Sequence, residues 1–165
     1  MRIPGPRIIG LVSAVVAAAA LGLALATERW GGLVPCSLCL LERWPYRVAI
    51  VLGLLIALVP RKAALPLLGL LVLTILVGAG LAALHSGVEF GWWPSPLPEC
   101  AAPNLGTGSI AERLAAMPAL PAKPCDDPTY LIPFLPVSMA AMNLLFGLVF
   151  AGLVVLSMRK RPRFP

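Results

Sequence analysis

Four cysteines are the residues of this chain whose type and spacing most directly suggest chemistry. Cys36 and Cys39 form a C-x-x-C motif that follows Pro35 and opens an apolar run expected to be helical. At a helix N-terminus, backbone N–H groups and the helix dipole favour thiolate over thiol, and the thiolate is the nucleophilic form of cysteine. The motif therefore indicates a redox-active pair more than a structural bridge.

Cys100 and Cys125 are a different pair, because 24 residues of a proline-rich segment separate them. A bond between them is expected to be exposed, so that an incoming thiolate can reach one of its sulfurs. The alternative is a bridge that only staples the loop by restricting the unfolded chain. Four cysteines allow three pairings, and the sequence alone does not choose among them.

Charged and polar residues near the C-x-x-C motif are candidates for a cofactor site. Arg43 lies four residues after Cys39, on the same helix face, where a permanent cation would stabilise a thiolate and attract a reduced, anionic cofactor. The alternative for Arg43, and more so for Arg47, is that the side chain reaches lipid headgroups. Glu42 is either a second candidate or an ion-pair partner. A lone histidine such as His85 is more typical of local hydrogen bonding than of catalysis.

The elements that position these residues follow from a composition too apolar for a soluble domain. Of 165 residues, 59% are hydrophobic and 12% charged, with a mean hydropathy of +0.92. About 20 apolar residues span a bilayer as a helix. The chain holds four such runs and one long polar loop: spans at 8–26, 40–59, 63–84 and 137–158, and a loop at about 85–133. We expect an all-α membrane protein, a four-transmembrane-helix bundle forming a single integral membrane domain over 1–165.

The basic residues predict the orientation of this bundle. Eight of the thirteen lysines and arginines lie near the termini or in the Arg61-Lys62 turn, whereas all seven acids lie toward the other end. Because positive charge marks the cytoplasmic side, both termini are predicted cytoplasmic, and the long loop and all four cysteines external. The net charge of +6 is thereby a topological signal, and no nucleic-acid partner is expected.

Two alternatives and two local features complete this interpretation. The first run could be a signal peptide cleaved after Ala26, although its 19 residues exceed the usual apolar core of such peptides. A four-cysteine zinc site is disfavoured, because an oxidising compartment favours disulfides, and no metal is expected. Asn143 is expected to donate an interhelical hydrogen bond. In the loop, Ser109 and Glu112 fit a capping box ahead of an apolar face formed by Ile110, Leu114 and Met117.

The segment Pro35 to Arg43, PCSLCLLER, resembles the Pro-Cys-x-x-Cys-x-x-Glu-Arg signature of the bacterial disulfide bond formation protein B (DsbB) family. The similarity continues through Pro94-Ser95-Pro96, Cys100, Cys125 and the stretch 138–143. It thus covers nearly the whole chain.

The resemblance implies a multi-pass protein of the bacterial inner membrane, with its active site facing the periplasm. It would reoxidise a DsbA-like periplasmic thiol oxidase and pass two electrons to a membrane quinone, ubiquinone or menaquinone, sustaining disulfide bond formation in exported proteins. The partner's thiolate would attack Cys100 of a Cys100–Cys125 bond, and the freed Cys125 would engage Cys36. Cys39 would then face the quinone.

In the same resemblance, Arg43 stabilises the Cys39 thiolate and the reduced quinone, and Glu42 and His85 are further candidates for the quinone site. Two other functions stay open at this point. One is a quinone-linked thiol oxidoreductase that acts directly on exported substrates. The other is a nonenzymatic membrane scaffold with two structural disulfides.

Overall fold

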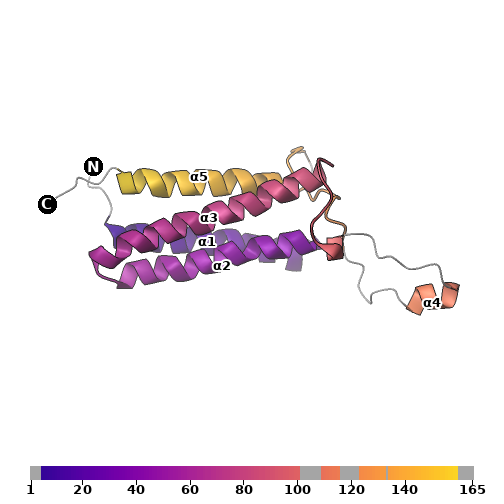
Figure 1. The fold of residues 1–165 in the computed structure, drawn as a ribbon, viewed down its shortest axis with the longest axis horizontal. Coiled ribbons are helices and arrows are strands. Elements are labelled where there is room, and N and C mark those ends of the chain that lie inside the picture. The colour runs from indigo at the N-terminus through magenta and orange to yellow at the C-terminus, as the bar shows by residue number, and fades with distance from the viewer. Residues whose placement is uncertain (1–4, 101–108, 116–122, 133, 160–165) are drawn as a thin grey trace.

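The structure is a computed structural model that describes residues 5–100, 109–115, 123–132 and 134–159. Four long helices lie side by side in it (Figure 1): α1 (Pro6–Arg29), α2 (Ser37–Leu58), α3 (Arg61–Glu89) and α5 (Met139–Arg159). Between α3 and α5 the chain forms a 3-10 turn, η1 (Pro98–Cys100), and a short helix, α4 (Ile110–Ala115). The predicted all-helical fold is confirmed.

The four long helices coincide with the four predicted spans to within a few residues. Among the described residues, α1, α3 and α5 are each long and apolar enough to cross a membrane. The helix α2 is of similar length but carries Glu42, Arg43 and Arg47. The four-span topology and its orientation therefore stay predictions.

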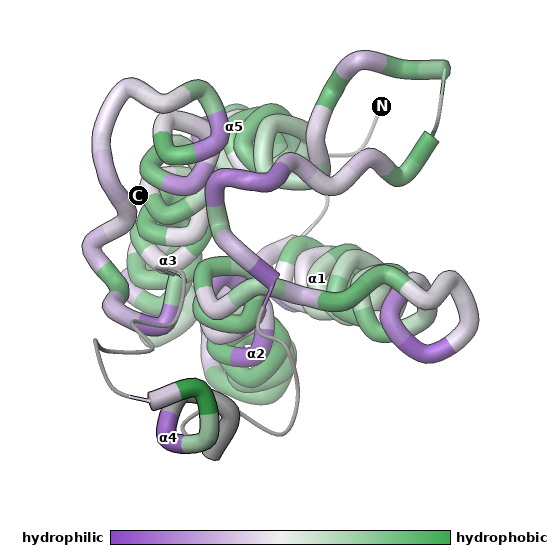
Figure 2. Tube along the Cα trace, turned by 90° about the vertical axis from the view of Figure 1, so that its right-hand side faces the viewer, coloured by the Kyte–Doolittle hydropathy of each residue, from purple (hydrophilic) through white to green (hydrophobic). Residues whose placement is uncertain are grey.

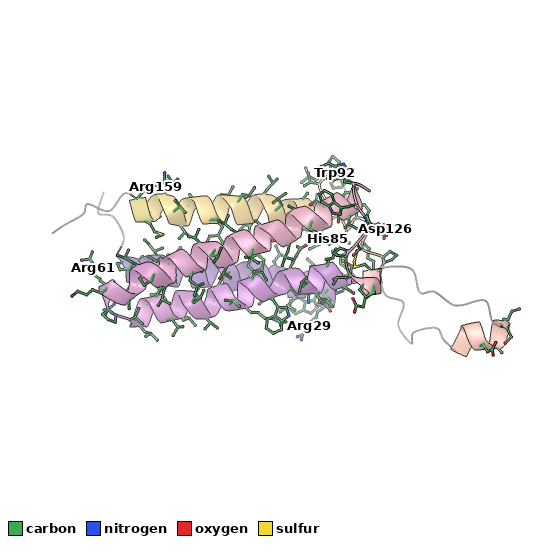
Figure 3. All side chains as sticks on the ribbon, viewed as in Figure 1. Arg29, Arg61, His85, Trp92, Asp126 and Arg159 are labelled. Carbon is green, nitrogen blue, oxygen red and sulfur yellow. A yellow bond between two sulfur atoms is a disulfide. The ribbon has the colours of Figure 1, made fainter. Side chains whose placement is uncertain are left out.

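Consecutive long helices run in opposite directions, which gathers distant parts of the chain at two ends. Figure 3 shows Arg61 and Arg159 at one end, and Arg29, His85 and Asp126 toward the other. At the second end lie the start of α2, the end of α3, the turn η1 and the start of α5. All four cysteines lie on these segments or beside them.

Small residues allow the helices to approach closely. A Cβ atom added to Gly53 of α2 would lie 2.6 Å from the carbonyl oxygen of Gly10 in α1, and one added to Gly10 would meet Gly53 in the same way. Gly147 of α5 faces Ala79 of α3. Large apolar side chains remain exposed on the long helices, which is the surface expected of helices in lipid. Figure 2 shows that hydrophobic residues, in green, make up much of each of these helices.

Two details of the loop prediction have different outcomes. The helix α3 continues to Glu89, beyond the predicted end at residue 84, because polar residues of its last turns bond to other helices instead of entering the loop. The capping box on α4 is confirmed, since Ser109 and Glu112 each accept the other's backbone N–H. Met117, the last residue of the predicted apolar face, lies outside the described residues.

Gly53→Ala is expected to destabilise the bundle although alanine favours helices. Its methyl would overlap the Gly10 carbonyl oxygen, and overpacking costs about 1–3 kcal/mol against a helix-propensity gain of about 1 kcal/mol. The control is Gly69→Ala in α3, where the added methyl meets nothing within 4 Å. Thermal unfolding in detergent should give a lower midpoint for Gly53→Ala than for Gly69→Ala. Equal midpoints would contradict the close α1–α2 contact.

Candidate active site

The C-x-x-C motif lies at the first turn of α2, as the sequence predicts. Cys36 is the N-cap, in an extended conformation, and its Sγ accepts the backbone N–H of Cys39 at 3.3 Å. One helical turn brings the two sulfurs to 3.0 Å, where they share a hydrogen bond as unbonded thiols. A sulfur thus takes the place of the oxygen that usually caps a helix, and the helix N-terminus favours its anionic form.

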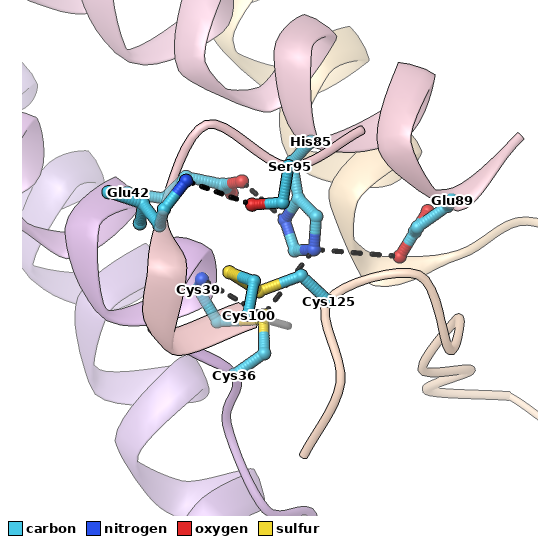
Figure 4. The surroundings of a disulfide bond; sticks show 9 residues. Cys36, Cys39, Glu42, His85, Glu89, Ser95, Cys100 and Cys125 are labelled. Carbon is cyan, nitrogen blue, oxygen red and sulfur yellow. Dashed lines mark hydrogen bonds and ion pairs between the residues drawn. A yellow bond between two sulfur atoms is a disulfide. The ribbon is translucent and has the colours of Figure 1, made fainter. Parts of the chain in front are cut away.

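His85 connects this motif to the other helices. Its Nε2 lies 3.4 Å from Cys36 Sγ, and its Nδ1 lies 2.7 Å from Glu42 Oε1 (Figure 4). The second oxygen of Glu42 accepts a hydrogen bond from the Asn143 amide, whose own oxygen accepts the Tyr46 hydroxyl. A continuous chain of polar contacts therefore runs through α2, α3 and α5. The predicted interhelical hydrogen bond of Asn143 is confirmed.

This series of polar contacts can move a proton away from Cys36. The Glu42 carboxylate holds the proton of His85 at Nδ1, so Nε2 faces the sulfur with its lone pair and can accept the thiol proton. The order cysteine, histidine, carboxylate is that of an activated nucleophile. Hydrogen bonds from Cys39 and then from His85 lower the pKa of Cys36 from 9.0 to about 4, against burial, which raises it. The hydrogen bonds of the site therefore favour the thiolate form of Cys36 at neutral pH.

The second pair forms the disulfide Cys100–Cys125, with its Cα atoms 5.0 Å apart. The expectation that this bond is exposed is wrong, because Cys100 is only 5% exposed and Cys125 only 1%. Both pack with Cys36 and Leu38 in one buried apolar cluster, and Figure 4 shows the bond lying alongside the C-x-x-C motif. The described segments around Cys100 and Cys125 lie against the start of α2 and the end of α3, which residue spacing could not reveal.

Arg43 and Arg47, one turn apart on α2, have different surroundings. Arg43 is buried, and its Nη2 lies 2.7 Å from Oε2 of Glu28, near the end of α1. Arg47 is exposed and lies over the Trp44 ring, 5.0 Å from its centroid. The lipid-facing alternative thus fits Arg47 and not Arg43. The ion pair of Arg43 is with a carboxylate, whereas the sequence places this cation beside the Cys39 sulfur.

A cavity of about 470 Å³ opens among α1, α2 and α5 beside the motif. Apolar side chains form most of its wall, and its size is in the range of small-molecule sites. Eight residues with polar side-chain groups also line it: Thr27, Cys39, Glu42, Arg43, Tyr46, His85, Thr129 and Asn143. The structure therefore brings Cys39 and all three predicted cofactor residues, Arg43, His85 and Glu42, to one cavity.

Two acids at this end were not singled out from the sequence. Glu89 Oε1 lies 4.0 Å from His85 Nε2, and its other oxygen accepts the Ser138 hydroxyl at the start of α5. The spacing of four residues between His85 and Glu89 is a signal that could have found this contact. Glu28 carries no such signal, because its partner belongs to another helix.

An all-helical fold with membrane-length helices and two adjacent cysteine pairs is the arrangement expected of a membrane protein that carries out thiol–disulfide exchange. A family model described as "Disulfide bond formation protein DsbB" matches residues 6–157, and the chain belongs to this family. It is 31% identical over 154 residues, 90% of this chain and 87% of the relative, to "Uncharacterized protein RP370" of Rickettsia prowazekii (strain Madrid E).

A second relative is "Disulfide bond formation protein B" of Azoarcus sp. (strain BH72), 31% identical over 106 residues. That alignment covers 63% of this chain and 61% of the relative. No solved structure matches the chain. Family membership supports a role as an oxidoreductase in disulfide bond formation.

The acidic Cys36 thiol gives a direct test of the site. In reduced protein carrying Cys100→Ser and Cys125→Ser, the ultraviolet absorbance of the Cys36 thiolate should persist far below pH 9.0 and fall at about pH 4. A reference with Cys36→Ser isolates that signal. His85→Ala should move the midpoint upward, because a hydrogen bond and a charge that favour the thiolate are lost. Ser86→Ala, a buried neighbour on α3, serves as the control; an unmoved midpoint in His85→Ala would refute the assignment.

Proposed function

We propose that this protein is a quinone-dependent protein-disulfide oxidoreductase of the bacterial inner membrane. It reoxidises the dithiol of a DsbA-like periplasmic thiol oxidase and transfers the two electrons to ubiquinone or menaquinone of the membrane pool. The observation that carries the proposal is the position of the C-x-x-C motif. Cys36 packs with the loop disulfide, and Cys39 lines the apolar cavity. Membership of the DsbB family supports the same reaction.

The proposal includes four membrane spans, with α2 as the additional one. Two of its charged residues, Glu42 and Arg43, are buried and bonded to His85 and Glu28 of neighbouring helices. Charges satisfied inside a bundle are compatible with a spanning helix, whereas charges facing lipid are costly. In this topology the end with Arg61 and Arg159 is cytoplasmic and the cysteine end is periplasmic, as the charge distribution favours.

Electrons enter through the loop disulfide in this proposal. A thiolate of the partner attacks the Sγ of Cys100, the less buried of the two residues, and the Cys100–Cys125 bond breaks to release the Cys125 thiolate. The second partner thiolate then attacks the mixed disulfide, leaving the partner oxidised and both loop cysteines reduced. Two electrons and two protons have entered the protein.

The reduced loop pair passes these electrons to an oxidised C-x-x-C. Cys125 attacks Cys36 and displaces Cys39 as a thiolate; Cys100 then attacks Cys125, reforming the loop bond and releasing Cys36. The buried contact between the two pairs supports this exchange, because no group has to cross solvent. The result is a loop disulfide beside two thiols, which is the bonding pattern described above.

The cavity residues fit a quinone. Its apolar wall suits a lipid-soluble ring and tail, and Arg43, His85 and Asn143 supply polar groups at one side. A bound quinone would accept the two electrons and two protons that Cys36 and Cys39 give up on forming their disulfide. His85 takes the Cys36 proton at Nε2 while Glu42 balances the resulting charge. Glu28 holds Arg43 in place at the cavity wall.

The experiment that tests this function is anaerobic mixing of the purified protein with a reduced DsbA-like partner and a soluble quinone. Quinol should form, detected optically, and Cys36→Ser or Cys39→Ser should abolish it. Cys125→Ser, mixed with the oxidised partner, should give a mixed disulfide through Cys100, because the free Cys100 thiolate breaks the partner's disulfide and no Cys125 thiol is present to resolve the adduct. Quinol formation without such a trapped adduct would favour direct action on other substrates. A protein whose cysteines stay oxidised under these conditions would be a scaffold.

Arg43 should affect the use of quinone more than the stability of the bundle. Arg43→Gln is expected to raise the apparent KM for quinone by about tenfold, the factor that corresponds to about 1.4 kcal/mol. Arg43→Lys should retain more activity, because it keeps the charge but loses the planar fork. Arg47→Gln is the control, since that side chain is exposed.

Loss of Arg43 also removes the ion pair of Glu28, whose side chain is 37% exposed, and this by itself costs the bundle some stability. The double variant Glu28→Gln with Arg43→Gln removes both charges and separates the two effects. It should regain thermal stability while its KM stays high. If the double variant recovered the wild-type KM, Arg43 would have only a structural role.

A further inference from the structure

Three side chains of the site have the chemistry and the placement of metal ligands. Cys36 Sγ, Cys39 Sγ and a ring nitrogen of His85 all lie within 4.8 Å of one another. The two sulfurs are 3.0 Å apart, and Cys36 Sγ is 3.4 Å from His85 Nε2. Around tetrahedral Zn²⁺, with bonds of about 2.3 Å to sulfur and about 2.0 Å to nitrogen, neighbouring ligand atoms are about 3.5–3.8 Å apart. The sulfurs would have to separate by less than about 1 Å.

The surroundings of His85 also resemble those of a metal-bound histidine. Metal-bound histidines usually donate their other N–H to a carboxylate, which fixes the tautomer and the ring orientation. Here Glu42 accepts from Nδ1 at 2.7 Å, so Nε2 is the nitrogen directed at the sulfurs. His85 and Cys36 are both 3% exposed, and their site is therefore shielded from competing water.

A fourth ligand is also within reach. Glu89 Oε1 lies 4.0 Å from His85 Nε2, and the Ser138 hydroxyl positions this carboxylate from the start of α5. Two thiolates, an imidazole and one oxygen, from Glu89 or from water, form a donor set suited to zinc. This set differs from the four-cysteine site considered from the sequence, because Cys100 and Cys125 are bonded to each other.

We propose that the dithiol form of this site binds one Zn²⁺ through Cys36, Cys39 and His85. Binding releases the two protons that Cys36, Cys39 and His85 share in the dithiol form and transfers no electrons. A Cys36–Cys39 disulfide offers no thiolate, so the oxidised form does not bind. Redox state therefore controls metal occupancy, and a bound cation holds both sulfurs in the reduced form. The binding itself does not depend on the proposed quinone reaction.

The test uses the full chain with Cys100→Ser and Cys125→Ser, so that the C-x-x-C is the one remaining cysteine pair. Reduced, anaerobic protein should take one equivalent of Zn²⁺ from a chromophoric chelator. The same protein oxidised to the Cys36–Cys39 disulfide should take none. Co²⁺ in place of Zn²⁺ should give the visible spectrum of a four-coordinate site with thiolate-to-metal charge transfer.

Variants separate this site from simple chelation by two thiols. His85→Ala should weaken Zn²⁺ binding by more than about tenfold, and Glu42→Ala, which acts through His85, by about 10- to 100-fold. Ser86→Ala should leave binding unchanged. His85→Gln, with helix content checked by circular dichroism, covers the case in which His85→Ala does not fold.

Two results would overturn the proposal. Equal binding by the histidine variants and the parent would mean that the dithiol alone chelates adventitiously. Equal binding by the oxidised and reduced proteins would mean that the cation lies elsewhere. Inhibition of quinol formation by Zn²⁺ is measured separately, so that failure of the proposed function and failure of the metal site give different outcomes.

Discussion

The contact of His85 with both Glu42 and Cys36 is the interaction on which the rest of this site depends. Burying a histidine and a carboxylate is costly unless each polar atom finds a partner. Here Nδ1 meets Glu42, Nε2 meets Cys36, and the second Glu42 oxygen meets Asn143. These partners belong to α2, α3 and α5, so satisfying one set of polar atoms fixes the relative positions of three helices.

The outer surface of the bundle contributes little to fixing the relative positions of the helices. Helices in lipid gain no hydrophobic energy by associating, so small residues and polar contacts decide how they pack. In this protein the small-residue contact and the polar contacts lie at different levels of the bundle. The Gly10–Gly53 contact joins α1 and α2 far from the cysteines, whereas the polar contacts join helices beside the cysteines. The ion pair of Glu28 with Arg43 adds α1 to the polar end. Packing thus places the helices, and polar contacts set their register at the site.

The sequence predicted the parts of this arrangement that depend on local spacing. Apolar runs located the long helices, and the C-x-x-C spacing placed Cys36 and Cys39 on one turn. It could not predict that Arg43 pairs with Glu28 or that the loop disulfide is buried, because both depend on which segments meet after folding. His85 shows the boundary between the two cases. Its place near the end of a span was visible, whereas its role as the link between a carboxylate and a thiol required the position of α2.

The burial of both cysteine pairs separates two requirements of the proposed reaction. Exchange between the pairs needs contact without solvent, and the cluster of Cys36, Cys100 and Cys125 supplies it. Attack by an external dithiol needs access to Cys100, so the loop has to uncover that sulfur when the partner docks. Cys39 faces the cavity on the other side of the motif. One helical turn therefore separates the loop disulfide from the cavity, and in the proposed reaction electrons pass from one to the other through the Cys36–Cys39 pair.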